Sequence, residues 1–222
     1  MRGWSQTPES QPGRPRLVRV PFDRVPGWVT RYDAAHSGTV WVVEPHEARA
    51  ESADGTRVRI SVPFTALADT SLDGLAAHLQ VPWHVGLVLV RRGGFAVVRL
   101  EGATVAESKI GRRHVQGRTK AGGWSQHRFA RRRDNQARAA FDAAADHVRR
   151  LLGQTARPLQ LLGTGGDRQA VTSVLARPEL AALRDLPQTW LGGLPDPRRA
   201  VVDTAIAQVR SVEVTITDPV EA

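Results

Sequence analysis

The stretch that decides the fold is VGLVLVRRGGFAVVRLEGATVAESKI, residues 85–110. Two apolar runs, residues 85–92 and 95–101, lie on either side of Gly93-Gly94, and paired glycines supply the positive φ angles that a two-residue hairpin turn demands. Residues 104–110 have the composition of a third strand. The sequence therefore predicts a meander of three antiparallel strands.

Helical and strand-like patterns alternate after the meander. Over residues 129–152, apolar side chains recur at spacings of three and four, which predicts a long amphipathic helix. The remaining predicted elements are a strand at 159–162, helices at 167–175, 178–186 and 197–209, and a strand at 211–217. A meander followed by helix–strand–helix units predicts an α/β fold with a mixed sheet, of the ribonuclease-H-like class.

The first 80 residues have a different character. Residues 1–16 are rich in Gly, Pro, Ser and Gln, which predicts a disordered tail. Residues 17–80 form a β-rich extension, and residues 81–222 form the main domain, with a basic loop at 111–128. The elements predicted within the extension are strands at 17–20, 39–44 and 57–62 and a helix at 71–80.

Composition excludes several classes of protein. The 222 residues include no cysteine, which excludes disulfides, thiolate metal sites and cysteine nucleophiles. The N-terminus lacks the apolar core of a signal peptide, and the longest apolar run, residues 85–90, is too short to span a bilayer. We expect a soluble cytoplasmic protein that is monomeric when free and makes no membrane contact.

The excess positive charge lies in one segment. The chain has 31 Lys and Arg against 22 Asp and Glu, a net charge of +9. Residues 109–138 contain ten basic residues and one acid, Asp134, so the rest of the chain balances at 21 of each sign. A concentrated basic patch indicates a polyanionic partner.

Within this segment Gln126 follows Gly122-Gly123 between arginine-rich flanks. Glycines let the backbone pass through a narrow place, and a carboxamide can hold a water molecule although it cannot act as a general base. The same composition also suits a loop that binds RNA or DNA without chemistry. The residues expected to contact nucleic acid are Arg112, Arg113, Arg118, Lys120, Trp124, Ser125, Arg128, Arg131, Arg132 and Arg133.

Other chemistry is poorly supported. A ribonuclease-H-type nuclease needs several carboxylates to hold two metal ions, and the meander offers only Glu101 and Glu107. The histidines beside the loop and before the meander lack metal-ligand spacing, so we expect neither a metal nor an organic cofactor. Residues 163–167 follow a strand and open a helix, which suits a phosphate cradle, but they lack the Gly-Lys-Ser/Thr ending of a P-loop.

Residues 118–136, RTKAGGWSQHRFARRRDNQ, resemble the active loop of the Vms-like release factors, in particular their actinobacterial branch. These proteins are related to the catalytic domain of eukaryotic class-one release factors, whose loop is Gly-Gly-Gln. The resemblance is dense over residues 117–136 and consistent in element order over residues 85–175. Trp124 and Ser125 separate the glycines from Gln126 here, a spacing that is similar to the Vms-like branch rather than to release factors in general.

This resemblance implies a release-factor-like catalytic domain and a peptidyl-tRNA hydrolase that rescues stalled ribosomal complexes. Its partners would be large-subunit rRNA and peptidyl-tRNA in the peptidyl-transferase centre. Gln126, Gly122 and Gly123 would carry the chemistry, with Gln126 placing a water against the ester carbonyl. Two other functions remain open from the residues: a non-catalytic RNA- or ribosome-binding factor, and an endonuclease that cuts near the tRNA 3′ end.

Overall fold

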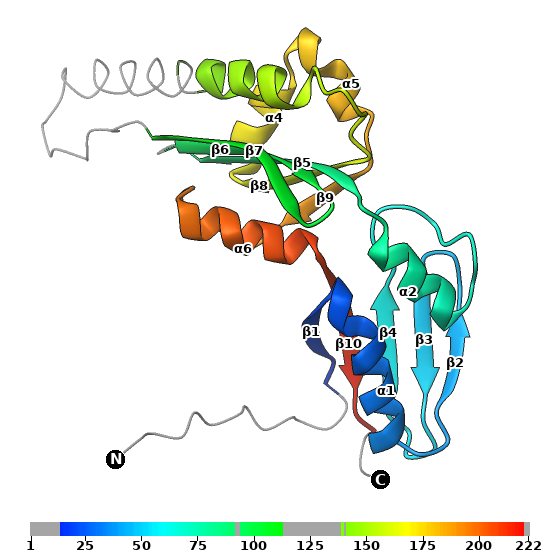
Figure 1. The fold of residues 1–222 in the computed structure, drawn as a ribbon. Coiled ribbons are helices and arrows are strands. Elements are labelled where there is room, and N and C mark those ends of the chain that lie inside the picture. Colours follow the sequence, from blue (N-terminus) through cyan, green and yellow to red (C-terminus); the bar gives the residue numbers. More distant parts are fainter. Residues whose placement is uncertain (1–13, 92–93, 113–138, 140, 220–222) are drawn as a thin grey trace, which may run out of the picture. The chain divides into compact units, whose positions relative to one another are not determined.

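The structure is a computed structural model that describes residues 14–91, 94–112, 139 and 141–219 (Figure 1). Backbone contacts divide the chain into two compact units, Met1–Gln80 with Arg210–Ala222, and Val81–Val209. Over the described residues each unit contains one five-stranded sheet together with helices. The protein is therefore mixed α/β, as the sequence predicts.

The first unit is built on an antiparallel sheet. Its elements are β1 (Arg16–Pro21), the 3-10 turn η1 (Phe22–Arg24), α1 (Val25–Ala35), β2 (Val40–Val43), β3 (Glu47–Glu51), β4 (Arg57–Ser61), α2 (Leu72–Gln80) and β10 (Ser211–Thr217). The strand order is β1-β10-β4-β3-β2. Side chains alternate between the two faces, so that on β4 Val58 and Ile60 are buried while Arg57 and Arg59 are exposed. Residues of α1 and α2 complete the core on the buried face.

Three features of this unit differ from expectation. Val25–Ala35 is a helix, whereas the sequence predicts no element over these residues. The helix tolerates Pro26 because this residue lies in the first turn, where its missing N–H breaks no intrahelical bond. The sequence does not predict β3, whose residues lack the β-branched side chains typical of strands. β10 was expected to belong with residues 81–222, yet it lies between β1 and β4 and pairs with both. Its partners are distant in the sequence, and local pattern carries no information about such pairing.

The second unit contains the predicted meander. Its elements are β5 (His84–Arg91), β6 (Gly94–Glu101), β7 (Thr104–Arg112), a helix that includes residues 141–152, β8 (Leu161–Gly166), α4 (Arg168–Leu175), η2 (Pro178–Leu180), α5 (Ala181–Arg184), β9 (Gln188–Leu191) and α6 (Arg199–Val209). The sheet order is β7-β6-β5-β8-β9. β5, β6 and β7 pair antiparallel, which confirms the meander, whereas β8 is parallel to β5 and β9 is parallel to β8.

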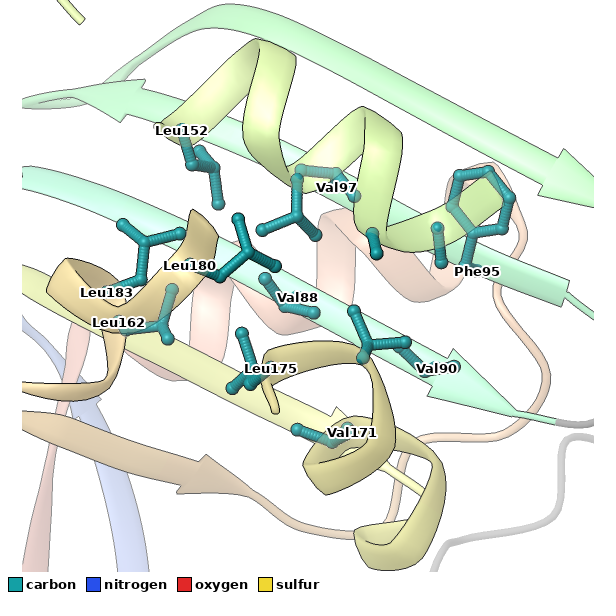
Figure 2. Close-up of a cluster of buried hydrophobic side chains, with 14 of the residues drawn as sticks. Val88, Val90, Phe95, Val97, Leu152, Leu162, Val171, Leu175, Leu180 and Leu183 are labelled. Atoms are coloured by element: carbon teal, nitrogen blue, oxygen red, sulfur yellow. The ribbon is translucent and has the colours of Figure 1, made fainter. Parts of the chain in front are cut away.

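Helices cover both faces of this sheet (Figure 1). On one face, residues 141–152 and α4 pack against alternate side chains of the strands, among them Val88 and Val97 (Figure 2). The opposite face lies against α6, where a Cβ built on Gly163 would be 3.6 Å from Val209 Cγ2. Because both faces are covered, β5 is buried along nearly its whole length and reads as a continuous apolar run.

Two expectations for this unit need correction. The predicted strand at 159–162 lies further along the chain as β8, which takes in the glycines that were expected to follow it. The predicted helix at 178–186 is instead η2 followed by α5, which ends at Arg184. The sequence also does not predict β9, a strand of only four residues. Of the long helix predicted at 129–152, residues 129–138 and 140 lie outside the described residues.

Gly111 makes a close approach near the end of β7. A Cβ built at this position would lie 2.3 Å from Phe95 Cε1 on the neighbouring strand. Phe95 is itself buried and packs against the His147 ring, with the ring centroids 5.3 Å apart. Burial, followed by the nearby charges of Arg150 and Lys109, lowers the pKa of His147 below its usual value. The aromatic ring therefore occupies the space that a side chain at position 111 would need.

We expect Gly111→Ala to lower the free energy of unfolding by about 1–3 kcal/mol, since an added methyl in a packed region forces its neighbours off their rotamers. Gly192→Ala is the matched control, because a Cβ there meets nothing within 4 Å and the backbone has no positive φ. Urea unfolding of the full chain measures both variants. Equal stability of the two would contradict the close approach to Phe95.

A hydrogen-bonded cluster stabilises one end of the first sheet. Ser52 Oγ lies 3.0 Å from Tyr32 Oη and 2.9 Å from Thr39 Oγ1. Asp54 Oδ2 lies 2.7 Å from His36 Nδ1, and Asp54 Oδ1 accepts a hydrogen bond from a backbone N–H two residues further on. The bond to His36, and then the backbone bond, lower the pKa of Asp54 to about 2.

The depressed pKa of Asp54 predicts a pH-dependent contribution to stability. A carboxyl group whose pKa is lower in the folded state stabilises the fold above its ordinary pKa of 3.8, and this contribution is lost as the pH falls toward 2. Asp54→Ala should therefore lower the urea midpoint at pH 7, and the difference from wild type should shrink between pH 4 and pH 2. Asp69→Ala, at an exposed aspartate of the same unit, is the matched control. A pH-independent difference for Asp54→Ala would count against the charge as the cause.

Candidate nucleic-acid interface

The sheet of the second unit brings four strand ends to one edge. β5 and β7 are each antiparallel to β6, and β8 and β9 are parallel to β5, so β5, β7, β8 and β9 all point the same way. Their carboxyl ends therefore share an edge, which we call the carboxyl edge. The basic segment, residues 109–138, continues past the end of β7 at Arg112, which lies at this edge.

Two arginine positions flank a glycine at the carboxyl edge. The register pairs Arg91 with Gly94, and Gly94 with Arg112, across three neighbouring strands. Two strand spacings separate the outer positions by roughly 10 Å. Gly94 contributes no side chain between them. Arg91 is partly buried, and its Nε atom is buried without a hydrogen-bond partner among the described residues.

The end of β8 lies on the other side of β5. Gly166 pairs with Val90 and has a φ of +104°, and a Cβ there would lie 2.3 Å from Val90 O, so only glycine fits. Asp167 begins the following turn, and its Oδ1 accepts a 3.1 Å hydrogen bond from the Ala170 N–H, which caps α4. The acid at this edge is therefore engaged in a helix cap.

Arg168 follows at the first position of α4. Its guanidinium carbon lies 4.1 Å from the centroid of the Trp190 ring, which belongs to β9. Arg168 is exposed, whereas Trp190 is half-buried against the core. The ring thus holds the cation at the surface of the carboxyl edge, in a cation–π contact.

Most of the residues that the sequence predicts for this site lie outside the described residues. They are Gly122, Gly123 and Gln126 of the expected chemistry and Arg113, Arg118, Lys120, Trp124, Ser125, Arg128, Arg131, Arg132 and Arg133 of the expected RNA contacts. They stay predictions. Arg112 is described as the last residue of β7. The sequence analysis did not select Arg91, Arg168 or Trp190. For the two arginines, a charged residue at or just after the end of a buried strand could have indicated a position at the edge of the sheet.

The phosphate cradle considered for residues 163–167 does not exist as a loop. Gly163 and Gly165 lie inside β8, paired with Leu87 and Leu89 of β5, and both are buried. A Cβ on Gly163 would lie 2.6 Å from Leu87 Cδ2, so this glycine makes room for a core side chain. A buried, paired strand offers no free N–H groups to a phosphate.

The two acids of the meander are engaged with one cation. Glu101 forms an ion pair with Arg99, and Glu107 Oε2 lies 3.9 Å from Arg99 Nη2. Within the described part of the chain there is no group of three or more His, Cys, Asp or Glu side chains placed to hold a metal ion. His78 belongs to α2 and His84 to β5, while His114 and His127 fall outside the described residues.

The first unit has one large open cavity of about 930 Å³ on the outer face of its sheet. Its lining includes the exposed Val40 and Val42 and three arginines. All three are neutralised by glutamates: Arg49 by Glu44 and Glu47, Arg57 by Glu51, and Arg59 by Glu47. Less positive charge is therefore available to a polyanion here than at the carboxyl edge.

Over the described residues, no helix has the length and apolar character needed to cross a membrane.

Comparison with known proteins identifies the family to which the chain belongs. A search of curated protein sequences finds no match. Among solved structures, an archaeal translation termination factor, aRF1, is similar at 15% identity with a TM-score of 0.36, over 72% of this chain and 51% of that one. The chain thus spans about half the length of that factor, and so loose a superposition carries no argument about function. The sequence model of the Actinobacteria/chloroflexi VLRF1 release factors matches residues 83–215, more than half of the 222 residues, and the chain belongs to this family of release factors.

Proposed function

We propose that this protein hydrolyses the ester bond of peptidyl-tRNA in the ribosomal peptidyl-transferase centre and so rescues stalled ribosomal complexes. One observation carries the proposal. In a chain that belongs to a release-factor family, Gly122-Gly123 and Gln126 occupy a segment of concentrated positive charge that starts at the carboxyl edge of the sheet.

The proposed reaction is attack of water on the ester carbonyl. The water oxygen bonds to the carbonyl carbon, and the carbon–oxygen bond to the terminal ribose of the tRNA breaks. The water proton ends on the departing ribose hydroxyl, so the products are a free peptide acid and an intact tRNA. Gln126 holds the water by donating and accepting hydrogen bonds at once, and it takes no proton because a carboxamide does not titrate near neutrality. Backbone N–H groups beside Gly122 and Gly123 stabilise the developing oxyanion.

The basic residues act as anchors rather than catalysts. Arginine forks bind phosphates of large-subunit rRNA and tRNA, which positions the loop without reading sequence. Trp124 stacks on a base of the tRNA end.

We also infer that the second unit has ribonuclease-H-like topology. An antiparallel meander followed by two strands parallel to its first strand supports this inference. The ion pairs of Glu101 and Glu107 with Arg99 disfavour the nuclease alternative.

Gln126→Ala should abolish peptide release and leave ribosome binding nearly unchanged, since the carboxamide is assigned to the water and not to docking. Purified protein is incubated with stalled ribosomal complexes that carry labelled peptidyl-tRNA, and both products are examined. Gln116→Ala, in the same segment, serves as the matched control and should release peptide like wild type.

Three outcomes separate the functions. Free peptide with intact tRNA supports hydrolysis. A shortened tRNA supports an endonuclease, and ribosome binding without any product supports a factor that only docks. Release by Gln126→Ala at the wild-type rate would show that the chemistry does not depend on this side chain.

Reversing the charges of Arg131, Arg132 and Arg133 to glutamate should weaken ribosome binding and flatten its salt dependence. Each lost phosphate contact removes roughly 0.7–0.9 from the slope of log K against log salt. The matched control reverses Arg31, Arg157 and Arg198, which are exposed arginines elsewhere, so the change in net charge is the same. Equal weakening by the two triple variants would mean that net charge, and not this cluster, governs binding.

A further inference from the structure

Arg91 is distinguished among the described arginines by a side-chain nitrogen, Nε, that is buried and has no hydrogen-bond partner within the described residues. This N–H is removed from solvent, and a buried donor left without an acceptor is unfavourable. No acid within the described residues forms an ion pair with it. By contrast, ion pairs with described acids are formed by Arg19, Arg49, Arg57, Arg59, Arg99, Arg177 and Arg199. An unpaired donor at a strand end suits an external anion.

Arg168 is the second uncompensated cation at the carboxyl edge. It forms no ion pair with a described acid, and its guanidinium carbon lies over the Trp190 ring, 4.1 Å from the centroid. An arginine stacked on an aromatic ring keeps its N–H groups free at the rim of the guanidinium, where they can bind a phosphate in a bidentate manner. The ring also restricts the side chain, which reduces the entropy lost on binding.

The two edges of the sheet differ in charge. The carboxyl edge holds Arg91, Arg112 and Arg168 against one acid, Asp167, whose carboxylate caps α4. Toward the opposite edge, Arg99 is held by Glu101 and Glu107. The residues that precede β8 and β9 there add two arginines, Arg157 and Arg184, and one acid, Asp185, so acids and arginines are equal in number at this edge. Positive charge is therefore concentrated where the basic segment leaves β7.

We propose that the carboxyl edge, through Arg91 and Arg168, is a phosphate-binding surface that holds the backbone of an RNA beside the loop. This inference rests on the proposed function, because it makes the rigid sheet a second anchor for the RNA that the loop enters. The acceptors are phosphodiester oxygens, which both arginines bind without regard to base sequence. The sheet edge fixes the position of the RNA relative to the end of β7, from which the loop continues.

The test measures binding of the full chain to two probes over a range of salt, deacylated tRNA and isolated large ribosomal subunits. The variants are Arg91→Gln, Arg168→Gln and the double variant. Arg157→Gln is the matched control, an exposed arginine that precedes β8 and so lies toward the opposite edge of the same sheet. Thermal unfolding of each variant checks that the fold is intact.

The double variant should bind on the order of tenfold or more weakly at low salt, and its salt slope should fall by about 1 to 2 relative to wild type. Arg157→Gln should match wild type. A loss on tRNA identifies tRNA as the source of the phosphates, and a loss on subunits alone identifies rRNA. If Arg91→Gln unfolds, Arg168→Gln decides alone, with a slope change of about 1 expected. Binding by the double variant that equals that of the Arg157→Gln control on both probes would overturn the inference.

The two proposals fail separately. If wild type releases peptide but the edge variants bind RNA normally, the phosphate surface is wrong and the hydrolase stands. If wild type releases no peptide while the edge variants lose RNA affinity, the hydrolase is wrong and the surface stands.

Discussion

The parallel pairing of β5 with β8 is the interaction on which the second unit depends. Its register places Gly163 and Gly165 beside Leu87 and Leu89, and this arrangement is possible only because the glycines have no side chains. A Cβ on Gly165 would lie 2.9 Å from the backbone oxygen of Leu191, so the same glycine run also sets the approach of β9. With both pairings parallel, β8 and β9 end at the edge where β7 ends. A different direction for β8 would remove Arg168 and Trp190 from the neighbourhood of the basic segment.

The positive charge of the second sheet that is not paired with acids lies at its carboxyl edge. Acids of the meander are neutralised by Arg99, and the aspartate at the carboxyl edge is used as a helix cap, so positive charge is left uncompensated at this edge. Uncompensated cations on a rigid sheet bind a polyanion with little loss of conformational entropy. The proposed division of labour follows from this difference. In the proposed mechanism, sheet and loop arginines hold RNA, and the neutral carboxamide of Gln126 positions water at the ester.

The first unit depends on a strand from the far end of the chain. β10 lies between β1 and β4 and supplies Val212, Val214 and Ile216 to the core. Without it, β1 would lose its only pairing in the described sheet. The family model ends at residue 215, inside this strand, so the matched region reaches from the second unit into the first. The arginines on the outer face of this sheet form ion pairs with glutamates, in contrast to Arg91 and Arg168 of the RNA surface proposed for the second unit.

Periodicity and turn residues were enough to predict the meander, α4, α6 and β10, because each of these elements buries a face whose pattern is local. Composition and the resemblance selected Gln126 and its glycines and indicated a polyanionic partner, and these stay predictions. Local pattern failed for α1, β3 and β9, where Pro26 lies inside a helix and where short strands owe their existence to neighbours. Only the tertiary structure decided that β10 belongs with the first unit, and that Arg91 and Arg168 lie at the edge from which the loop departs. Strand direction and sheet order are set by contacts between distant residues, and the sequence of any one strand does not encode them.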